Sequence, residues 1–315
     1  MPLEKLVLPS PLQKLDDQRF VEKSVEVYLK RDDLIHPVIS GNKWRKLKYF
    51  IAQHDSHLGV LSFGGAFSNH LVALAYACNQ RGIPSVGIVR GERSSEQNST
   101  LSYCQKLGMQ LHFADRQTYK KRNQVDYWRE LQAVYPNYVI LPEGGRTKEA
   151  LLGVGEIITE VPLEFTHIVC PVGSGTTLAG LAAKVQYHQQ VIGVAALAKA
   201  DYLRAEVEQL LMLQDKDKNN WQLMTDFHLG GFAKSSPDLL SYIQRFYQLH
   251  QVTLDPIYTG KMCMAFEKML LADKFPPGSK IILLHTGGLQ GWHGFKQMKR
   301  VNDDYLASIN WLPAD

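Results

Sequence analysis

The chain has 315 residues, 45% of them hydrophobic and 21% charged, and this length is expected to form one large or two moderate domains. Such a composition excludes a disordered tail, a collagen-like repeat and a coiled coil. The formal net charge is only +4, so we expect no nucleic-acid partner and no membrane partner.

The first residues and the cysteines indicate the cellular compartment. The segment MPLEKLVLPSPLQKL contains acidic and proline residues where a signal peptide would need an apolar run. No apolar stretch is long enough to cross a bilayer. The four cysteines lie far apart without a CxxC pair, which argues against a disulfide framework and against a zinc site. We therefore expect a cytoplasmic protein with buried or idle thiols and no metal.

From about residue 58 onward the chain alternates short apolar runs with amphipathic stretches. Seven runs rich in Val, Ile and Leu predict strands: GVLSF, PSVGIV, MQLHF, NYVILP, HIVCPV, VIGVAAL and KIILLH. A helix is predicted over residues 177–190, with Leu178, Leu181, Ala182 and Val185 on one face. This alternation favours parallel sheets with helices on both faces, and hence the α/β class.

The domain boundaries are less marked, because no linker rich in Pro, Gly or Ser divides the chain. A small domain over residues 47–146 would leave residues 1–46 and 147–315 as a discontinuous large domain. Ligands of open α/β sheets bind outside the carboxyl ends of strands and in clefts between domains. The loops that follow strands are therefore the candidate binding segments: GGAFSNH, PEGGRTKE, VGSGTTLAG and HTGG.

The segment SGNKWRKL (residues 40–47) predicts a helix start, with Ser40 or Asn42 as its cap. Four cations would lie near the positive helix end, where they are unfavourable: Lys43, Arg45, Lys46 and Lys48. We interpret most of them as a solvated basic face. Lys43 is the exception, because a cation-rich helix start should lower its pKa, and a neutral amine is what Schiff-base formation requires.

The segment GGAFSNH again follows a predicted strand and opens a helix. Ser68 and Asn69 are typical N-cap residues, and they could also present a hydroxyl and an amide to a ligand. His70 follows them without an acidic neighbour in the sequence. At the other end of the chain, Thr286 in HTGG would project into the cleft, or it would simply end a strand.

The loop VGSGTTLAG is a candidate anion site, because it follows a strand and opens a helix whose N–H groups converge there. It lacks the lysine of a Walker loop, and Leu178 occupies the third glycine position of a dinucleotide fingerprint. The loop suits one phosphate group, although a tight strand-to-helix turn explains it equally well.

These motifs occur together in one order between Lys30 and Gly288: KRDDL, SGNKWRKL, GGAFSNH, LPEGG, VGSGTTLAG, IYTGKM and HTGG. In this set the sequence resembles the family of D-cysteine desulfhydrase and 1-aminocyclopropane-1-carboxylate deaminase, which are pyridoxal-phosphate enzymes of fold type II. The resemblance implies two open twisted, mainly parallel sheets with flanking helices, as in the tryptophan synthase β-like fold. It also implies pyridoxal 5′-phosphate as cofactor, a small amino acid as substrate and, by analogy, a homodimer.

The resemblance implies which residues hold the cofactor. Lys43 corresponds to the lysine that binds it covalently, Asn69 to the asparagine that contacts the ring 3′-oxygen, and Thr286 to the hydroxyl that faces the pyridine nitrogen. A hydroxyl cannot hold a proton on that nitrogen as a carboxylate does, so the ring should be a weaker electron sink and favour elimination. The phosphate cup corresponds to Gly173, Ser174, Gly175, Thr176 and Thr177.

The resemblance also implies a substrate side that includes Ser68, Asn69, His70 and Tyr258. In the deaminases a glutamate follows this tyrosine, whereas here Thr259 follows it. Ring opening of the cyclopropane has no α-proton to remove and relies on that specialised site, so the threonine speaks against a deaminase. The family often has a tyrosine in place of Phe232, so one substrate-side hydroxyl is missing here.

The resemblance therefore implies a carbon–sulfur lyase, or a deaminase of the hydrolase class, that releases ammonia and a 2-oxo acid. The leading substrate is D-cysteine, which would yield pyruvate, sulfide and ammonia, with Lys43, Ser68 and Tyr258 as catalytic residues. The alternative substrate is 1-aminocyclopropane-1-carboxylate, and serine racemase-like or other β-elimination activities stay open. A non-catalytic pyridoxal-phosphate binder is the alternative from another class. A nucleotide-binding oxidoreductase is disfavoured by the missing third glycine.

Overall fold

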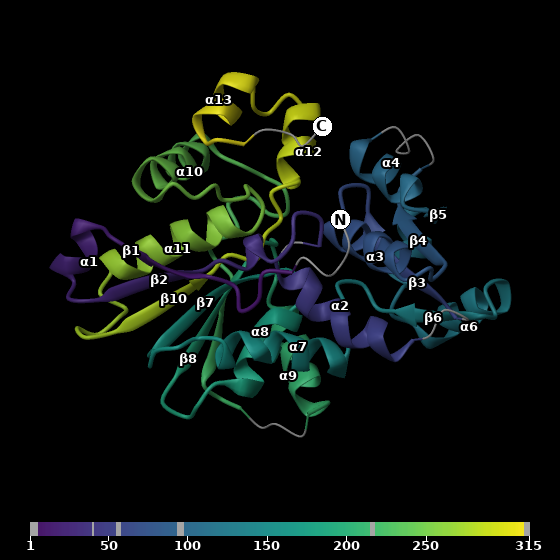
Figure 1. The fold of residues 1–315 in the computed structure, drawn as a ribbon, viewed down its shortest axis with the longest axis horizontal. Helices are drawn as coiled ribbons and strands as arrows, with labels where there is room; N and C mark the ends of the chain where they lie inside the picture. Colours follow the sequence, from purple (N-terminus) through teal and green to yellow (C-terminus); the bar gives the residue numbers. More distant parts are fainter. Residues whose placement is uncertain (1–5, 40, 55–57, 93–97, 215–217, 312–315) are drawn as a thin grey trace.

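The computed structural model describes residues 6–39, 41–54, 58–92, 98–214 and 218–311, which form two β-sheets surrounded by helices (Figure 1). The strands of the larger sheet follow the order β1-β2-β10-β7-β8-β9, and those of the smaller sheet the order β5-β4-β3-β6. All neighbouring strands described are parallel except β1 and β2. The predicted α/β class with two mainly parallel sheets is confirmed.

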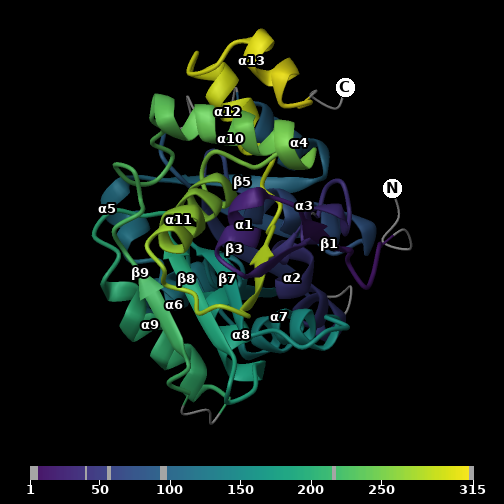
Figure 2. The same cartoon turned by 90° about the vertical axis from the view of Figure 1, so that its left-hand side faces the viewer.

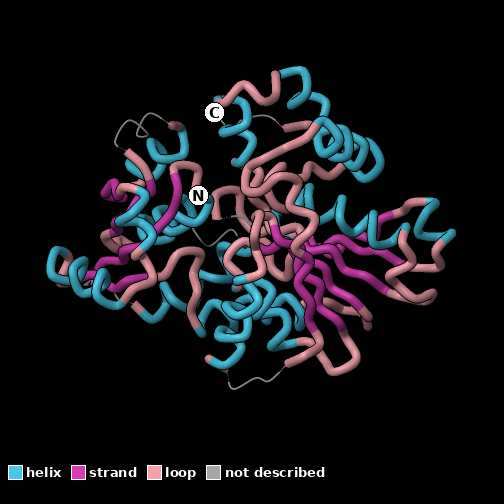
Figure 3. The backbone as a smooth tube through the Cα atoms, turned by 180° about the vertical axis from the view of Figure 1, so that it is seen from behind, coloured by secondary structure: helices cyan, strands magenta, loops and turns pink. Residues whose placement is uncertain are grey.

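The two sheets draw on different parts of the chain, and Figure 3 shows them as separate groups of strands. The larger sheet contains β1 (Leu12–Leu15), β2 (Glu26–Lys30), β7 (His167–Val172), β8 (Gln190–Ala195), β9 (Trp221–Met224) and β10 (Lys280–Leu284). The smaller sheet contains β3 (Gly59–Gly65), β4 (Ser85–Arg90), β5 (Met109–Ala114) and β6 (Tyr138–Leu141).

Helices cover both faces of the larger sheet, as Figures 1 and 2 show. One face carries α7 (Lys148–Thr159), α8 (Thr176–Lys184) and α9 (Tyr202–Met212). The other carries α1 (Gln18–Glu22), α10 (Pro237–His250), α11 (Thr259–Leu271), α12 (Gly291–Gln297) and α13 (Asp303–Ser308). Because both faces are buried, the central strands β7, β8 and β10 are largely apolar rather than alternating.

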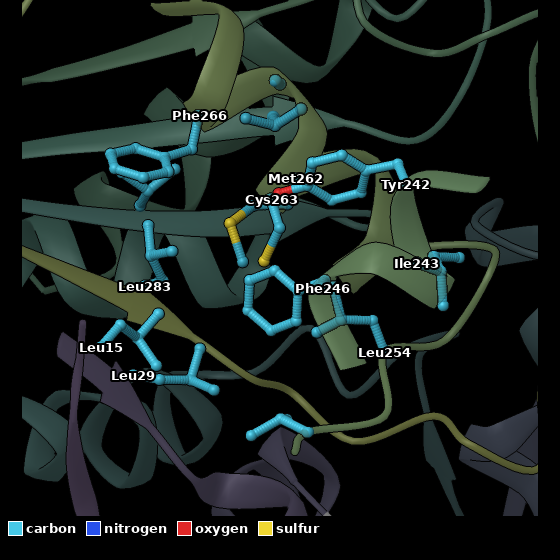
Figure 4. Packing of buried hydrophobic residues seen from close by; sticks show 14 of the residues in the cluster. Leu15, Leu29, Tyr242, Ile243, Phe246, Leu254, Met262, Cys263, Phe266 and Leu283 are labelled. Carbon is cyan, nitrogen blue, oxygen red and sulfur yellow. The ribbon is translucent and has the colours of Figure 1, made fainter. Parts of the chain in front are cut away.

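The core between the larger sheet and its second helical layer is shown in Figure 4. Leu29 and Leu283 of neighbouring strands pack with Met262 and Phe266 of α11, and Phe246 of α10 joins the same cluster. Side chains one position along the strands, such as Ile282, pack against α7–α9 instead. This period of two is the geometry of a pleated strand.

The smaller sheet is also covered on both faces. Helices α2 (Asn42–Gln53), α3 (Asn69–Gln80) and α4 (Ser99–Lys106) cover one face, and α5 (Arg116–Lys120) and α6 (Val125–Val134) cover the other. The strands of this sheet lie within the range 47–146 that the sequence predicts for a small domain. The domain boundaries themselves stay a prediction.

The strand predictions are confirmed for the seven apolar runs, which correspond to β3–β8 and β10. Strands β1, β2 and β9 were not predicted. They have four or five residues each and include polar or charged side chains, as in LQKL and EVYLK, so no apolar run marks them.

The predicted helix over residues 177–190 is wrong in its second half. Helix α8 ends at Lys184, and Val185 has extended backbone angles. The Gln189 side chain then accepts a hydrogen bond of 2.8 Å from the Gln186 N–H, which forms the turn into β8. The residues predicted to form the apolar face of this helix are all buried in one hydrophobic cluster: Leu178, Leu181, Ala182 and Val185.

Two further expectations concern the cysteines and the membrane. Cys78, Cys104, Cys170 and Cys263 are all free and buried, as predicted. Within the described ranges, no helix has both the length and the apolar character needed to cross a membrane.

Candidate active site

A cavity of about 890 Å³ lies where the carboxyl ends of the two sheets meet. Its walls come from segments that follow β3, β4, β5, β6, β7, β8 and β10, and from the starts of α2, α3 and α8. This is the location expected for a ligand of an open α/β sheet, and the volume is within the usual range for ligand pockets.

Most of the site residues predicted from the sequence line this cavity: Lys43, Ser68, Asn69, His70, Gly173, Ser174, Gly175, Thr177, Phe232, Tyr258 and Thr286. Thr176 is the exception. It is fully buried outside the cavity wall, and its hydroxyl oxygen lies 3.1 Å from the Ser174 hydroxyl oxygen.

Helix α2 begins against the loop that follows β10. Gly41 has a φ of 64°, and a Cβ on it would lie 1.8 Å from the Thr286 carbonyl oxygen. Only glycine permits both this conformation and this close approach. The helix start is therefore fixed against Thr286, and Lys43 enters the cavity beside that loop.

The predicted caps of α2 need correction. Ser40 lies outside the described residues, and Asn42 is the first residue of the helix rather than its cap. The Asn42 side chain instead donates a hydrogen bond of 2.8 Å to the Thr177 hydroxyl and accepts one of 3.0 Å from Lys43 Nζ. It therefore links the lysine to the start of α8. Asn42 is a site residue that the sequence analysis missed.

The pKa of Lys43 is lowered to about 8. Burial is the cause, and the charge of Asp255 opposes it. The predicted direction is thus supported, but the predicted reason, cations around the helix start, is not. A lysine with this pKa supplies a large fraction of neutral amine near pH 8.

The interpretation of the remaining α2 cations as a solvated basic face is wrong. Arg45 is 1% exposed and bonds to Asp32 and Glu160, while Lys48 is partly buried against Glu156. Lys46 is 4% exposed and lines the cavity. Its pKa lies well below the ordinary value because of burial and, secondly, the charge of Lys43. Partners distant in the sequence cover this face, so local spacing could not reveal it.

The glycine loop after β7 has the geometry of an anion cup. Gly175 has a φ of 78° and stands at the N-terminus of α8. The loop lines the cavity, so the unpaired N–H groups of the first helical turn and the positive end of the helix dipole are at the cavity wall. One phosphate group is the natural ligand of this arrangement.

Gly175→Val provides a test of the cup. A valine here would have to adopt a left-handed φ, and its Cβ would lie 3.0 Å from Val207 Cγ2. The loop or the Val207 side chain must therefore shift. Losing one charge-assisted hydrogen bond costs about 1.5–3 kcal/mol, so the affinity for pyridoxal phosphate should fall by about tenfold or more. Equilibrium titration of the apoprotein with the cofactor measures this change.

Gly108→Val is the matched control, because Gly108 has a φ of 84° and open space around its Cβ position. It carries similar backbone strain outside the cavity. Equal cofactor affinity in the two variants would reduce the glycine loop to a packing turn.

The start of α3 presents three side chains to the cavity. Ser68 caps the helix, as predicted, by accepting a hydrogen bond of 3.2 Å from the Leu71 N–H. Asn69 is the first helical residue, and its amide nitrogen lies 3.2 Å from the position that a Cβ on Gly288 would take. The start of α3 is therefore packed against the loop that carries Thr286.

His70 lines the cavity, and its ring is neutral. Its Nε2 lies 2.8 Å from the Ser62 hydroxyl oxygen, which donates to the Leu141 carbonyl and therefore accepts from the histidine. Its Nδ1 is buried and has no partner among the described residues. Burial, followed by the charges of Lys43 and Lys46, lowers the pKa of His70 to about 3, so the ring is neutral.

Tyr258 and Phe232 form one side of the cavity. Their rings are 6.0 Å apart between centroids, in an edge-on arrangement. Burial, followed by the charges of Asp255 and Glu143, raises the pKa of Tyr258 above its ordinary value. The phenol therefore keeps its proton and can donate it in a hydrogen bond.

Thr259, which stands where the deaminases have a glutamate, is fully buried and does not line the cavity. Its hydroxyl donates a hydrogen bond of 2.5 Å to Asp255. The same carboxylate accepts from the N–H of Tyr258 at 2.8 Å. A buried acid that the sequence analysis missed therefore lies directly behind the wall.

Comparisons with known proteins agree with this geometry. Residues 3–287 match the family model described as pyridoxal-phosphate dependent enzyme. A Thermotoga maritima protein with the provisional name 1-aminocyclopropane-1-carboxylate deaminase is 31% identical, over 96% of this chain and 100% of its own. The bifunctional D-cysteine desulfhydrase/1-aminocyclopropane-1-carboxylate deaminase of Arabidopsis thaliana is 28% identical, over 98% and 82%. The solved structure of an ACC deaminase homologue superposes with a TM-score of 0.80 at 25% identity, over 96% of this chain and 94% of its own.

Proposed function

The chain belongs to the family of pyridoxal-phosphate dependent enzymes, and from this premise we propose that it releases ammonia and a 2-oxo acid from a small amino acid, with D-cysteine as the leading substrate. The observation that carries the proposal is Lys43, with its pKa lowered to about 8, in one cavity with an anion cup and the starts of α2 and α3. The expected hydrolase class does not describe this activity, because the relatives are named as deaminases and as a desulfhydrase.

The residues of the cavity fit pyridoxal phosphate. The N–H groups at Gly173–Gly175 and the hydroxyls of Ser174 and Thr177 would hold the phosphate, and Lys43 would form the covalent link. Asn69 at the start of α3 and Thr286 in the loop after β10 would contact the ring. When bound, the cofactor supplies an electron sink for the carbanion that forms at the substrate's α-carbon.

The side chains around the cofactor position supply the proton transfers. Lys43 Nζ is a base that can accept the α-proton near neutral pH because its pKa is lowered. The Ser68 hydroxyl and the Tyr258 phenol line the same cavity and would bind the substrate and donate protons to it. With D-cysteine, one water is consumed, and pyruvate, hydrogen sulfide and ammonia are released. With the cyclopropane acid, one water gives 2-oxobutanoate and ammonia.

Parallel assays of pyruvate from D-cysteine and L-cysteine, and of 2-oxobutanoate from 1-aminocyclopropane-1-carboxylate, test the proposal. We expect the highest kcat/KM with D-cysteine, because its elimination needs only an α-proton, a base and a thiolate leaving group. Efficient ring opening with little pyruvate would make the chain a deaminase despite Thr259. A cofactor-loaded protein that releases no 2-oxo acid from any of the three would favour the non-catalytic binder.

Phe232→Tyr should raise turnover. Phe232 is 47% exposed and lies on the cavity wall beside Tyr258, so the added hydroxyl would face the substrate side. One hydrogen bond is worth about 0.5–1.5 kcal/mol, which corresponds to an increase in kcat/KM of about 2- to 12-fold. Phe113→Tyr on β5, outside the cavity, is the control. Unchanged or lower kcat/KM in Phe232→Tyr would contradict the idea of a missing hydroxyl.

The compartment and the assembly are further parts of the proposal. The four free, buried cysteines support a reducing compartment such as the cytoplasm. A homodimer is proposed by analogy with the fold type. Light scattering of the purified holoenzyme measures the assembly, and a monomeric mass at micromolar concentration would refute it.

A further inference from the structure

The cavity extends beyond the side chains assigned to the cofactor and a small substrate. Its outer part, which we call the outer chamber, follows β4 and β5 of the smaller sheet and is lined by Arg90, Arg116, Tyr119, Lys120 and Arg122. Tyr202 and Glu206 of α9 face it from the side of the larger sheet, and Arg146 lines it from the segment after β6. None of these residues has a role in the proposed elimination.

The outer chamber carries an excess of positive charge. Among the residues that the structure describes, five cationic side chains line it but only two carboxylates, those of Glu143 and Glu206. Arg122 forms an ion pair with Glu143, and Arg146 forms one of 2.9 Å with Glu206. Among the described residues, no ion pair is found for the other three cations: Arg90, Arg116 and Lys120.

A buried aromatic ring holds the chamber together. Tyr119 is 4% exposed, and its hydroxyl donates a hydrogen bond of 2.8 Å to Glu143. The guanidinium groups of Arg90 and Arg122 lie 6.0 Å and 5.0 Å from the centroid of its ring. Because Glu143 is already bound by both Tyr119 and Arg122, it does not compensate the charge of Arg90.

A substrate with one carboxylate does not account for this charge. The cofactor's phosphate has its own cup at the start of α8, and the Ser68 hydroxyl at the start of α3 is available to the substrate's α-carboxylate. The exposed side chains of Arg90, Arg116 and Lys120 add three positive charges to one chamber, and an anion bound there would reduce their mutual repulsion. Planar arginine groups are also suited to carboxylate, sulfonate or phosphate ligands.

We propose that the outer chamber binds a second acidic group, carried on the side chain of the preferred amino-acid substrate. The inference rests on the proposed function, because it assigns the substrate class of the same site. D-cysteine would then be accepted for its leaving group, whereas the preferred substrate is an amino acid whose β-substituent carries a carboxylate, sulfonate or phosphate.

Isothermal titration of the holoenzyme with aspartate and with alanine tests the proposal, because the two differ by one side-chain carboxylate and neither carries a β-leaving group. Both enantiomers are used. At low ionic strength we expect aspartate to bind about tenfold more tightly than alanine, and this ratio should shrink at high salt. A ratio of one would overturn the proposal, and so would the absence of binding by either amino acid.

Replacement of the unpaired cations by methionine locates the effect. The triple variant Arg90→Met, Arg116→Met, Lys120→Met should bring the aspartate-to-alanine affinity ratio close to one. Lys121→Met is the matched control, because Lys121 follows Lys120 directly, is exposed and does not line the cavity. A ratio that the triple variant retains, or that Lys121→Met lowers equally, would refute the chamber as the site.

Titration with inorganic phosphate distinguishes a chamber that binds an acidic group of the substrate from one that binds a free anion. If the three cations strengthen phosphate binding but leave aspartate no tighter than alanine, the chamber holds a free anion and the substrate assignment is overturned. Turnover does not enter these titrations. A holoenzyme that prefers aspartate but degrades neither D-cysteine nor the cyclopropane acid would support the chamber and refute the proposed function.

Discussion

Lys43→Ala should lower the release of 2-oxo acid by about 10²–10⁴-fold, the usual contribution of a positioned general base. It should also remove the covalent link to the cofactor. The wild-type holoenzyme should absorb visible light and lose that band on treatment with borohydride, with the pyridoxyl group fixed on Lys43. Peptide mass spectrometry of the reduced protein identifies the labelled residue.

The neighbouring lysines make this assignment falsifiable. Lys46 also lines the cavity one turn further along α2, so a label on Lys46 would transfer the role to it. Lys48 lies outside the cavity and pairs with Glu156, so Lys48→Ala is the control and should keep the visible band.

The lowered pKa of Lys43 adds a pH dependence to the same prediction. Only the neutral amine attacks the cofactor's aldehyde, so the rate of cofactor capture by the apoprotein rises with pH as Lys43 loses its proton. The midpoint should lie at about 8 rather than at the ordinary value of 10.5. A midpoint near 10.5, measured by stopped-flow absorbance, would show that the amine is solvated rather than buried.

The parts of the fold that the sequence predicted are those with a local signal. An apolar run such as HIVCPV is bounded by polar residues and buried on both faces, so its extent in β7 matches the prediction. Strand β2 lies between β1 and β10 of the larger sheet but has the sequence EVYLK. Its Lys30 is buried because Glu160 and the Ser10 carbonyl bind it. Such pairing between distant segments leaves no periodic pattern in the sequence.

The residues of the candidate site also fall into those with a local sequence signal and those defined by distant contacts. Loops after strands and typical cap residues led to Ser68 and to the glycine cup, because their roles follow from neighbouring backbone groups. Asn42 and Asp255 were missed, since each acts through contacts that only the folded chain creates. The prediction of a solvated basic face on α2 is wrong for the same reason. Arg45 of this face is expected to contribute to the free energy of unfolding.

Arg45→Met should lower the free energy of unfolding by about 3–5 kcal/mol, because it leaves buried carboxylates without their partner. Arg45 is 1% exposed and binds Asp32, which is fully buried, through two hydrogen bonds of 2.7 and 2.8 Å. It also binds Glu160 twice at 2.8 Å. Urea denaturation at pH 7 measures the loss.

Arg129→Met is the control for a surface pair. Arg129 lies on α6, its side chain is 74% exposed, and it pairs with Asp126 at 2.8 Å. Exposed pairs contribute less than about 1 kcal/mol, so this variant should unfold close to the wild type. A loss in Arg45→Met no larger than in Arg129→Met would mean that the buried cluster does not stabilise the fold.

The dependence of the free energy of unfolding on pH tests the contribution of Glu160 to the same cluster. Burial alone would raise the pKa of Glu160, but hydrogen bonds from Arg45 and Lys30 lower it to about 2 from 4.5. A carboxyl group with a lowered pKa contributes stability that is present above its unfolded value and is lost as the pH falls toward its folded value. The wild type should therefore lose stability between about pH 4.5 and pH 2, and this loss should be smaller in Arg45→Met.

Arg45→Met should also bind the cofactor more weakly. Arg45 is two residues from Lys43 on α2, so its buried ion pairs help to fix the part of the helix that carries the lysine.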